Sequence, residues 1–160
     1  MQANRHGILP LLFKAVKETG FSNSVPPEIL EKLQIGYLTT LMKNKTLLND
    51  LKPVLKKFYA AEIPVILLKG AALCLTTYED IALRPLGDVD ILVKKKDVTK
   101  ACDLLESQGF SRIGGLYRVP DSLNAERGCE WVYHKGNNVF ELHWALLDKL
   151  APFPLEMQLF

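Results

Sequence analysis

Apolar positions recur at intervals of three and four in the first third of the chain, which is the spacing of a helix buried on one face. This pattern covers residues 8–19, returns at the Pro-Pro pair 26–27 with apolar positions up to residue 41, and continues as helix over residues 49–61. Pro53 lies within the last stretch, where it either occupies a first turn or kinks the helix. We therefore predict an N-terminal helical region over residues 1–62 that packs on the rest of the protein.

From residue 63 onward the pattern changes to short apolar runs bounded by glycine, proline and asparagine. Runs rich in β-branched and aromatic residues predict strands, here at residues 64–68, 89–93, 110–117, 129–134 and 139–144. An amphipathic helix is expected over residues 97–109, with Asp97 at its N-cap or in its first turn. The predicted fold class is α/β (α+β), a small mixed β-sheet flanked by helices with an N-terminal helical cap. We assign this core to residues 63–148.

Composition narrows the class of protein. The chain has 160 residues, 48% hydrophobic and 24% charged, so it can bury the core of one ordinary globular domain. Its net charge of +2 is too small to indicate nucleic acid or a membrane surface as a partner. The three cysteines are scattered without a CxxC spacing, which favours reduced thiols over disulfides or a zinc site. No signal peptide or membrane-spanning apolar run is present, so we expect a cytoplasmic protein.

Three further segments have no regular pattern. The lysine run at residues 94–96 is either a solvated strand end, which we favour, or part of a path for polyphosphate or RNA. Residues 121–127 are polar, and we expect a mobile loop near the site. Residues 149–160 form an apolar tail, which predicts either further sequence beyond Phe160 or a partner that covers it.

The first candidate for chemistry is a pair of carboxylates beside a buried strand. Asp88 and Asp90 stand two residues apart in Gly-Asp-Val-Asp-Ile, and side chains at i and i+2 of a strand leave the same face. Two close carboxylates repel each other unless a cation lies between them. Mg²⁺ is the natural counter-charge, because it prefers carboxylates, water and phosphate oxygens. The alternative is a strand end that carries two solvated aspartates.

A second candidate follows a turn signal at residues 136–138. Glu141 and His143 alternate with apolar residues and share one face of the predicted strand. A hairpin around the turn would bring Glu141 to the sheet that carries the aspartates. Three carboxylates can hold two divalent ions across an in-line phosphoryl displacement. Otherwise Glu141 is a solvent-facing strand residue and His143 a structural histidine.

The third candidate is the turn at Lys69-Gly70, where an apolar strand runs directly into good helix formers. Glycine allows close approach of a ligand to the backbone, and the helix start offers free N–H groups to a phosphate. Lys69 adds a positive charge, and Arg84 follows before the aspartate pair. Alone this signal is weak, because strand–glycine–helix turns occur in many proteins that bind no ligand.

Taken together, these motifs resemble the uncharacterised nucleotidyltransferase family of the DNA polymerase β-like nucleotidyltransferase superfamily. The resemblance spans residues 63–147 and is carried by Leu68-Lys69-Gly70, Arg84, residues 87–93 and Glu141-Leu142-His143-Trp144. The superfamily turn is usually Gly-Ser or Gly-Gly, whereas this chain has Gly70-Ala71 and so no serine hydroxyl to contact the phosphates. The resemblance implies further helical sequence after the tail, involved in choosing the acceptor.

The resemblance implies transfer of a nucleoside monophosphate from an NTP to an acceptor hydroxyl with Mg²⁺ or Mn²⁺. Asp88, Asp90 and Glu141 would hold the metals, His143 would assist, and Lys69, Gly70 and Arg84 would hold the triphosphate. The acceptor is left open between a small molecule, RNA and protein. Two alternative functions remain, namely a catalytically silent nucleotide-binding or interaction domain and a metal-dependent phosphohydrolase.

Overall fold

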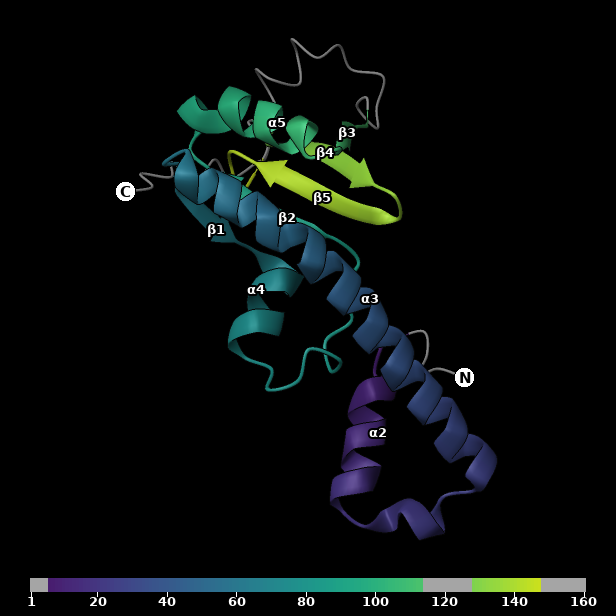
Figure 1. Ribbon diagram of the computed structural model, residues 1–160. Coiled ribbons are helices and arrows are strands. Elements are labelled where there is room, and N and C mark those ends of the chain that lie inside the picture. Colours follow the sequence, from purple (N-terminus) through teal and green to yellow (C-terminus); the bar gives the residue numbers. More distant parts are fainter. Residues whose placement is uncertain (1–5, 114–127, 148–160) are drawn as a thin grey trace.

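The computed structural model describes residues 6–113 and 128–147 (Figure 1). This part of the chain contains four α-helices around a five-stranded mixed sheet, which confirms the predicted α/β class. The helices are α2 (Leu9–Glu18), α3 (Pro27–Ala60), α4 (Lys69–Thr76) and α5 (Val98–Ser107), with short 3₁₀ turns η1 (Phe21–Ser24) and η2 (Lys95–Asp97). Among the described residues, no helix is both long and apolar enough to span a membrane.

The sheet joins two segments that are distant in sequence. Its strands are β1 (Val65–Leu67), β2 (Val89–Val93), β3 (Ser111–Arg112), β4 (Glu130–Lys135) and β5 (Asn138–His143). They lie in the order β1-β2-β5-β4-β3. β2 and β5 pair in parallel at the centre, and the other neighbouring strands pair antiparallel. The β4–β5 hairpin with its turn at residues 136–137 is therefore confirmed.

The two faces of the sheet have different chemistry. Residues directly opposite each other on neighbouring strands share a face, so Val89 and Ile91 of β2 lie on the same side as Phe140 and Leu142 of β5. This side meets α3 and α5 in one apolar core, to which they contribute Leu47, Leu51, Val54, Phe58, Ala101 and Leu105. Each buried leucine, valine or phenylalanine of this set contributes roughly 1.5–3 kcal/mol to stability. The opposite face carries Asp90 of β2 and Glu141 and His143 of β5.

Helix α3 continues without interruption through Pro53. The expectation that Pro53 occupies the first turn of a separate helix is therefore wrong. Pro53 is exposed between the buried Leu51 and Val54, so the hydrogen bond that proline cannot make is lost on the solvent side, while the packed side of the helix stays intact.

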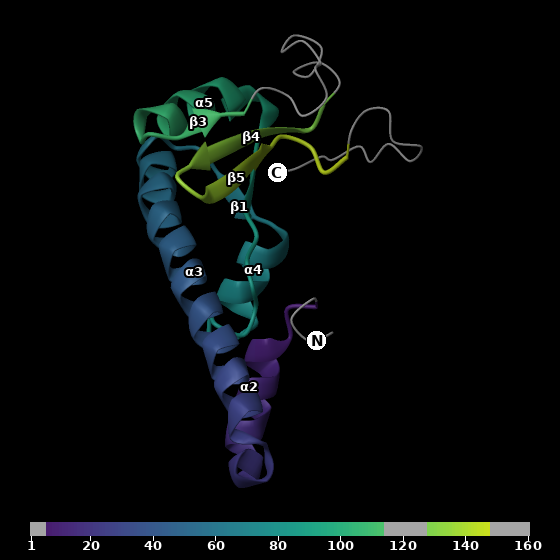
Figure 2. The ribbon, with the colours of Figure 1, turned by 90° about the vertical axis from the view of Figure 1, so that its right-hand side faces the viewer.

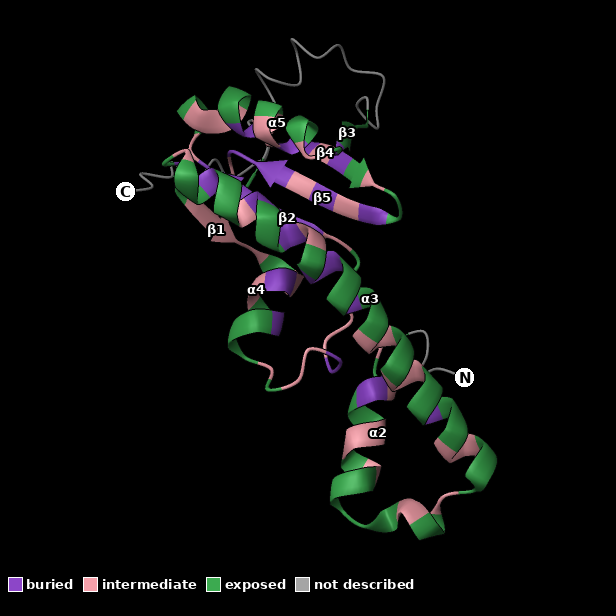
Figure 3. Ribbon diagram, viewed as in Figure 1, coloured by how far each residue is buried: buried purple, intermediate pink, exposed green. Residues whose placement is uncertain are grey.

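The N-terminal half of α3 and the packed helix α2 extend away from the sheet (Figure 2). Buried positions concentrate on the strands and on the part of α3 that faces them, whereas most of the α2 end is exposed (Figure 3). Phe13 and Tyr37 pack in this extension with ring centroids 5.3 Å apart. Tyr37 also donates a hydrogen bond to Asp80 Oδ2 at 2.6 Å, which ties α3 to the loop after α4.

Other local predictions are confirmed only in part or concern residues that the structure does not describe. Asp97 is the N-cap of α5, but its side chain makes no capping hydrogen bond. The strand predicted at residues 110–117 is β3, which is described only at Ser111–Arg112. The predicted loop at residues 121–127 and the apolar tail at residues 149–160 lie outside the described residues.

Candidate active site

Sheet register brings the acidic residues of the two central strands together. Asp90 of β2 lies directly opposite Glu141 of β5, and His143 follows two residues later on the same face of β5. Asp90 is fully buried, His143 is nearly so and Glu141 is half-buried. The polar face of the sheet thus has its charged groups at the junction of its two parallel strands.

The three side chains form a compact set of potential ligand atoms. His143 Nε2 lies 3.1 Å from Asp90 Oδ1 and 3.4 Å from Glu141 Oε2. One ligand atom from each of the three residues lies within 4.8 Å of those from the other two. The imidazole is also held from its other side, because His143 Nδ1 lies 3.1 Å from Glu130 Oε2 on β4.

Lys69 enters this cluster from the edge of the sheet. Leu68 N–H donates to the carbonyl of Asp90 at 3.0 Å and so extends the β1–β2 pairing by one residue. Lys69 then adopts φ +45°, a left-handed conformation that costs free energy for a residue other than glycine. Its ammonium contacts Asp90 Oδ1 at 2.5 Å and Glu141 Oε2 at 3.4 Å. An internal cation therefore neutralises part of the carboxylate charge.

The ionisable groups of the cluster differ in the direction in which the protein shifts their pKa values. Burial raises the pKa of Asp90, but hydrogen bonds from Lys69, Glu141 and His143 outweigh burial, and the pKa ends below its usual value. Burial raises the pKa of Glu141, and its hydrogen bond to Asp90 raises it further. The hydrogen bond to Asp90 raises the pKa of Lys69. Asp90 and Lys69 are thus the firmly charged pair, and Glu141 takes up a proton more readily than an ordinary glutamate.

The donor set suits a divalent cation. Asp90 Oδ2 is buried and has no hydrogen-bond partner, although a buried carboxylate oxygen normally has one. The two carboxylates are oxygen ligands of the kind that Mg²⁺ and Mn²⁺ prefer, and the imidazole is a ligand that suits Mn²⁺ better than Mg²⁺. The residues present therefore fit the metal that the sequence motifs imply.

The remaining predicted site residues lie around this cluster. Asp88 is half-buried and precedes the first residue of β2, and it does not belong to the group formed by Asp90, Glu141 and His143. Gly70 occupies the first turn of α4, where a β-carbon would lie 3.1 Å from Leu86 Cδ2. Arg84 lies in the loop between α4 and β2, and its buried Nε has no hydrogen-bond partner. The proposed ligand role of Asp88 and the phosphate role of Arg84 stay predictions.

The family described as "Uncharacterised nucleotidyltransferase" matches residues 1–158, nearly the whole chain. The chain belongs to this family. No curated protein and no solved structure matches it. A member of this nucleotidyltransferase family therefore brings Asp90, Glu141 and His143 together on one face of its sheet.

Sequence reasoning missed two residues that shape the site of this nucleotidyltransferase-family protein. Asn44 of α3 is fully buried, and its amide donates to the carbonyls of Ile81 and Arg84 at 2.5 and 2.8 Å. Its Oδ1 accepts from Leu86 N–H at 3.1 Å, so one side chain fixes the loop that leads to Asp88. No sequence signal marks a single asparagine of this kind. Glu130 was also missed, although the two-residue turn at 136–137 places it opposite His143.

Proposed function

We propose that this protein is a metal-dependent nucleotidyltransferase that moves a nucleoside monophosphate from an NTP to an acceptor hydroxyl. In this reaction the hydroxyl oxygen bonds to the α-phosphorus, the bond to the β-phosphate oxygen breaks, and pyrophosphate leaves. Family membership supports the reaction class. The observation that carries the proposal for this chain is the fully buried Asp90, opposite Glu141, with one oxygen that has no partner.

Asp90, Glu141 and His143 would hold the cation, and Asp88 would add a carboxylate from the start of β2. Bound there, Mg²⁺ or Mn²⁺ would offset the negative charge that builds up on the transferring phosphate and on pyrophosphate. Glu130 would hold the His143 ring through Nδ1, so that Nε2 faces Asp90 and the cation. The candidate catalytic residues are therefore Asp88, Asp90, Glu141 and His143.

Lys69 has two successive roles in this proposal. In the free protein its ammonium neutralises Asp90 and Glu141. The side chain is 61% exposed, so it can turn toward solvent and contact a triphosphate when a metal takes over the carboxylates. Gly70 stands in the first turn of α4, where the lack of a side chain would let a phosphate approach the backbone N–H groups, and Arg84 would supply a second cation from the neighbouring loop.

The test is to incubate the protein with each labelled NTP, Mg²⁺ or Mn²⁺ and a cell extract, and to identify what becomes labelled. A small molecule, an RNA or a protein that carries the label identifies the acceptor class. Asp90→Asn should abolish labelling, whereas Asp103→Asn, a change at an exposed aspartate of α5, should leave it unchanged. Release of free nucleoside monophosphate alone would instead indicate transfer to water, which is the phosphohydrolase alternative.

One observation favours a second candidate, a catalytically silent nucleotide-binding or interaction domain. The ammonium of Lys69 already lies against Oδ1 of Asp90 and Oε2 of Glu141, so part of the carboxylate charge is neutralised without any metal. If this pairing is permanent, the protein binds neither Mg²⁺ nor Mn²⁺ detectably. Metal titration by calorimetry on wild type and on Lys69→Met separates the two candidates, because a silent site gains metal binding only when the lysine is removed.

A further inference from the structure

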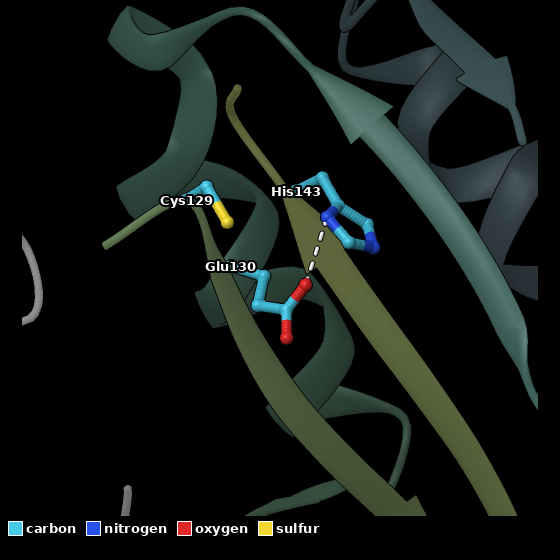
Figure 4. A group of neighbouring side chains, drawn as sticks. All are labelled: Cys129, Glu130 and His143. Carbon is cyan, nitrogen blue, oxygen red and sulfur yellow. Dashed lines mark ion pairs between the residues drawn. The ribbon is translucent and has the colours of Figure 1, made fainter. Parts of the chain in front are cut away.

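A second set of metal-ligating side chains lies beside the carboxylate pair. One ligand atom each from Cys129, Glu130 and His143 lies within 4.8 Å of the other two. Figure 4 shows these side chains gathered where β4 begins and β5 ends, with the ion pair between Glu130 and His143 drawn as a dashed line. His143 belongs to both sets and faces them with different nitrogens, Nδ1 toward Glu130 and Nε2 toward Asp90.

The hairpin explains why these residues meet. Glu130 and His143 are paired residues of β4 and β5 and therefore share a face. Successive residues of a regular strand would point to opposite faces, but Cys129 lies in a bend just before β4, and this places its thiol beside the pair. Trp144 N–H donates to the carbonyl of Cys129 at 2.9 Å and fixes the bend against the end of β5.

We propose that Cys129, Glu130 and His143 form a site for a thiophilic divalent metal of the Zn²⁺ class, separate from the Mg²⁺ or Mn²⁺ position on Asp90 and Glu141. A thiolate, an imidazole and a carboxylate are the ligand types that Zn²⁺ takes, whereas Mg²⁺ avoids sulfur. Three protein ligands leave the fourth tetrahedral position to water. Binding forms a metal–sulfur bond and releases the thiol proton to water.

The surroundings of His143 match those of a zinc-ligating histidine. Such histidines usually donate their other ring N–H to a carboxylate, which fixes the tautomer and the ring orientation. With the metal on Nδ1, the proton of His143 resides on Nε2, which lies 3.1 Å from Oδ1 of the fully buried Asp90. Bond lengths of about 2.0–2.3 Å separate tetrahedral ligand atoms by about 3.3–3.7 Å. Nδ1 of His143 and Oε2 of Glu130 are already 3.1 Å apart, so small side-chain rotations complete the geometry.

Because both sets of ligands include His143, a metal at one site changes metal binding at the other. A metal on Nδ1 commits Nε2 of His143 to hydrogen-bond donation, so this nitrogen no longer offers a lone pair to a cation on Asp90 and Glu141. Occupation by Zn²⁺ therefore weakens binding of Mg²⁺ or Mn²⁺ next door without blocking the carboxylates themselves. The inference concerns metal binding alone and does not depend on nucleotidyl transfer.

The test is titration of the reduced protein with Co²⁺, a spectroscopic substitute for Zn²⁺, in a buffer that contains excess Mg²⁺ to occupy the carboxylate site. We expect a cobalt–thiolate charge-transfer band that saturates at one Co²⁺ per chain. Added Zn²⁺ should displace the Co²⁺ and remove the band. Cys129→Ser removes the band, and Glu130→Gln weakens cobalt binding by about tenfold or more, by analogy with the loss of a supporting ligand group. Cys102→Ser, at a half-buried cysteine of α5, keeps the band.

A second measurement does not depend on a substituted protein. Zn²⁺ should protect Cys129 from alkylation, as read by peptide mass mapping, while Cys102 in the same sample is alkylated equally with and without metal. Absence of a thiolate band in wild type, a band unchanged in Cys129→Ser, or alkylation of Cys129 that Zn²⁺ does not slow would each overturn the proposal.

Discussion

The ammonium of Lys69 lies 2.5 Å from Oδ1 of Asp90, a carboxylate with no exposed surface. The lysine reaches this position because it follows the last residue that pairs with β2 and then turns the chain through φ +45°. A buried carboxylate needs a nearby positive charge, and here a side chain of the protein supplies it. An external cation that binds Oδ1 of Asp90 must therefore compete with Lys69.

Replacing Lys69 should reveal this competition. Lys69→Met leaves the buried charge of Asp90 without its cation, so we expect the free energy of unfolding in EDTA to fall by about 1–3 kcal/mol, the range for an unsatisfied buried partner. The loss stays below that of a fully buried ion pair because the lysine side chain is 61% exposed. Urea denaturation with and without Mn²⁺ measures it, and Mn²⁺ should stabilise the variant more than wild type.

Lys96→Met is the matched control, since Lys96 is exposed on η2, away from the carboxylates. It should change neither stability nor the response to Mn²⁺. Equal Mn²⁺-induced shifts in Lys69→Met and wild type would show that the lysine and the metal occupy different places.

The carboxylates should differ in their importance for metal binding. Mg²⁺ or Mn²⁺ should raise the melting temperature of wild type, and Asp90→Asn should remove this rise, because Asp90 is the buried member of the cluster. Glu141→Gln should remove most of it, and Asp88→Asn should reduce it less, since Asp88 lies outside the group. Thermal denaturation with a metal titration is the measurement.

Without metal, Asp90→Asn should also lower stability near neutral pH. The folded state depresses the pKa of Asp90, so it favours the charged form that the amide cannot provide. The exposed Asp103→Asn serves as control for both effects. A metal-induced rise that survives intact in Asp90→Asn would place the cation elsewhere on the protein.

Local sequence signals predicted the parts of this site that local geometry controls. The turn at residues 136–137 fixes the hairpin register residue by residue, so Glu130 opposite His143 follows from counting outward from the turn. The cluster that Cys129 joins is harder to predict from the sequence, because its members do not form a CxxC pair and meet only through this hairpin register.

Long-range pairing was not predictable in the same way. The parallel register of Asp90 with Glu141 joins two strands that are separated in sequence by α5, β3 and β4, and periodicity within each strand does not determine it. The left-handed backbone at Lys69 was also hidden, because such a conformation is expected of glycine, and Gly70 stands next to it. Burial of Asn44 depends on the path of the loop that it holds.

Asn44 should be important for folding, although it contacts no ligand atom of the site. Asn44→Ala leaves the carbonyls of Ile81 and Arg84 and the N–H of Leu86 without their side-chain partner, and we expect a loss of about 2–4 kcal/mol in the free energy of unfolding. Asn49→Ala on the exposed side of the same helix should cost much less. Chemical denaturation of the two variants checks the difference, and similar losses would mean that the loop is held by its apolar contacts instead.

The donor pocket gives the last prediction. If Lys69, Gly70 and Arg84 hold a triphosphate, Lys69→Ala and Arg84→Ala should each weaken NTP binding by about 1–3 kcal/mol, and binding should need metal and fall with salt. Gly70→Ala should weaken NTP binding more than it changes stability. Its methyl group would meet Leu86 Cδ2 at 3.1 Å, and this end of a flexible side chain needs to shift only slightly, while the backbone approach for phosphate is lost. Calorimetry with a non-hydrolysable NTP analogue and Mg²⁺, beside urea denaturation of the same samples, provides both readouts. Wild-type protein that binds no analogue at millimolar concentration would leave a catalytically silent interaction domain as the better account, because Lys69 would then serve only as the partner of Asp90.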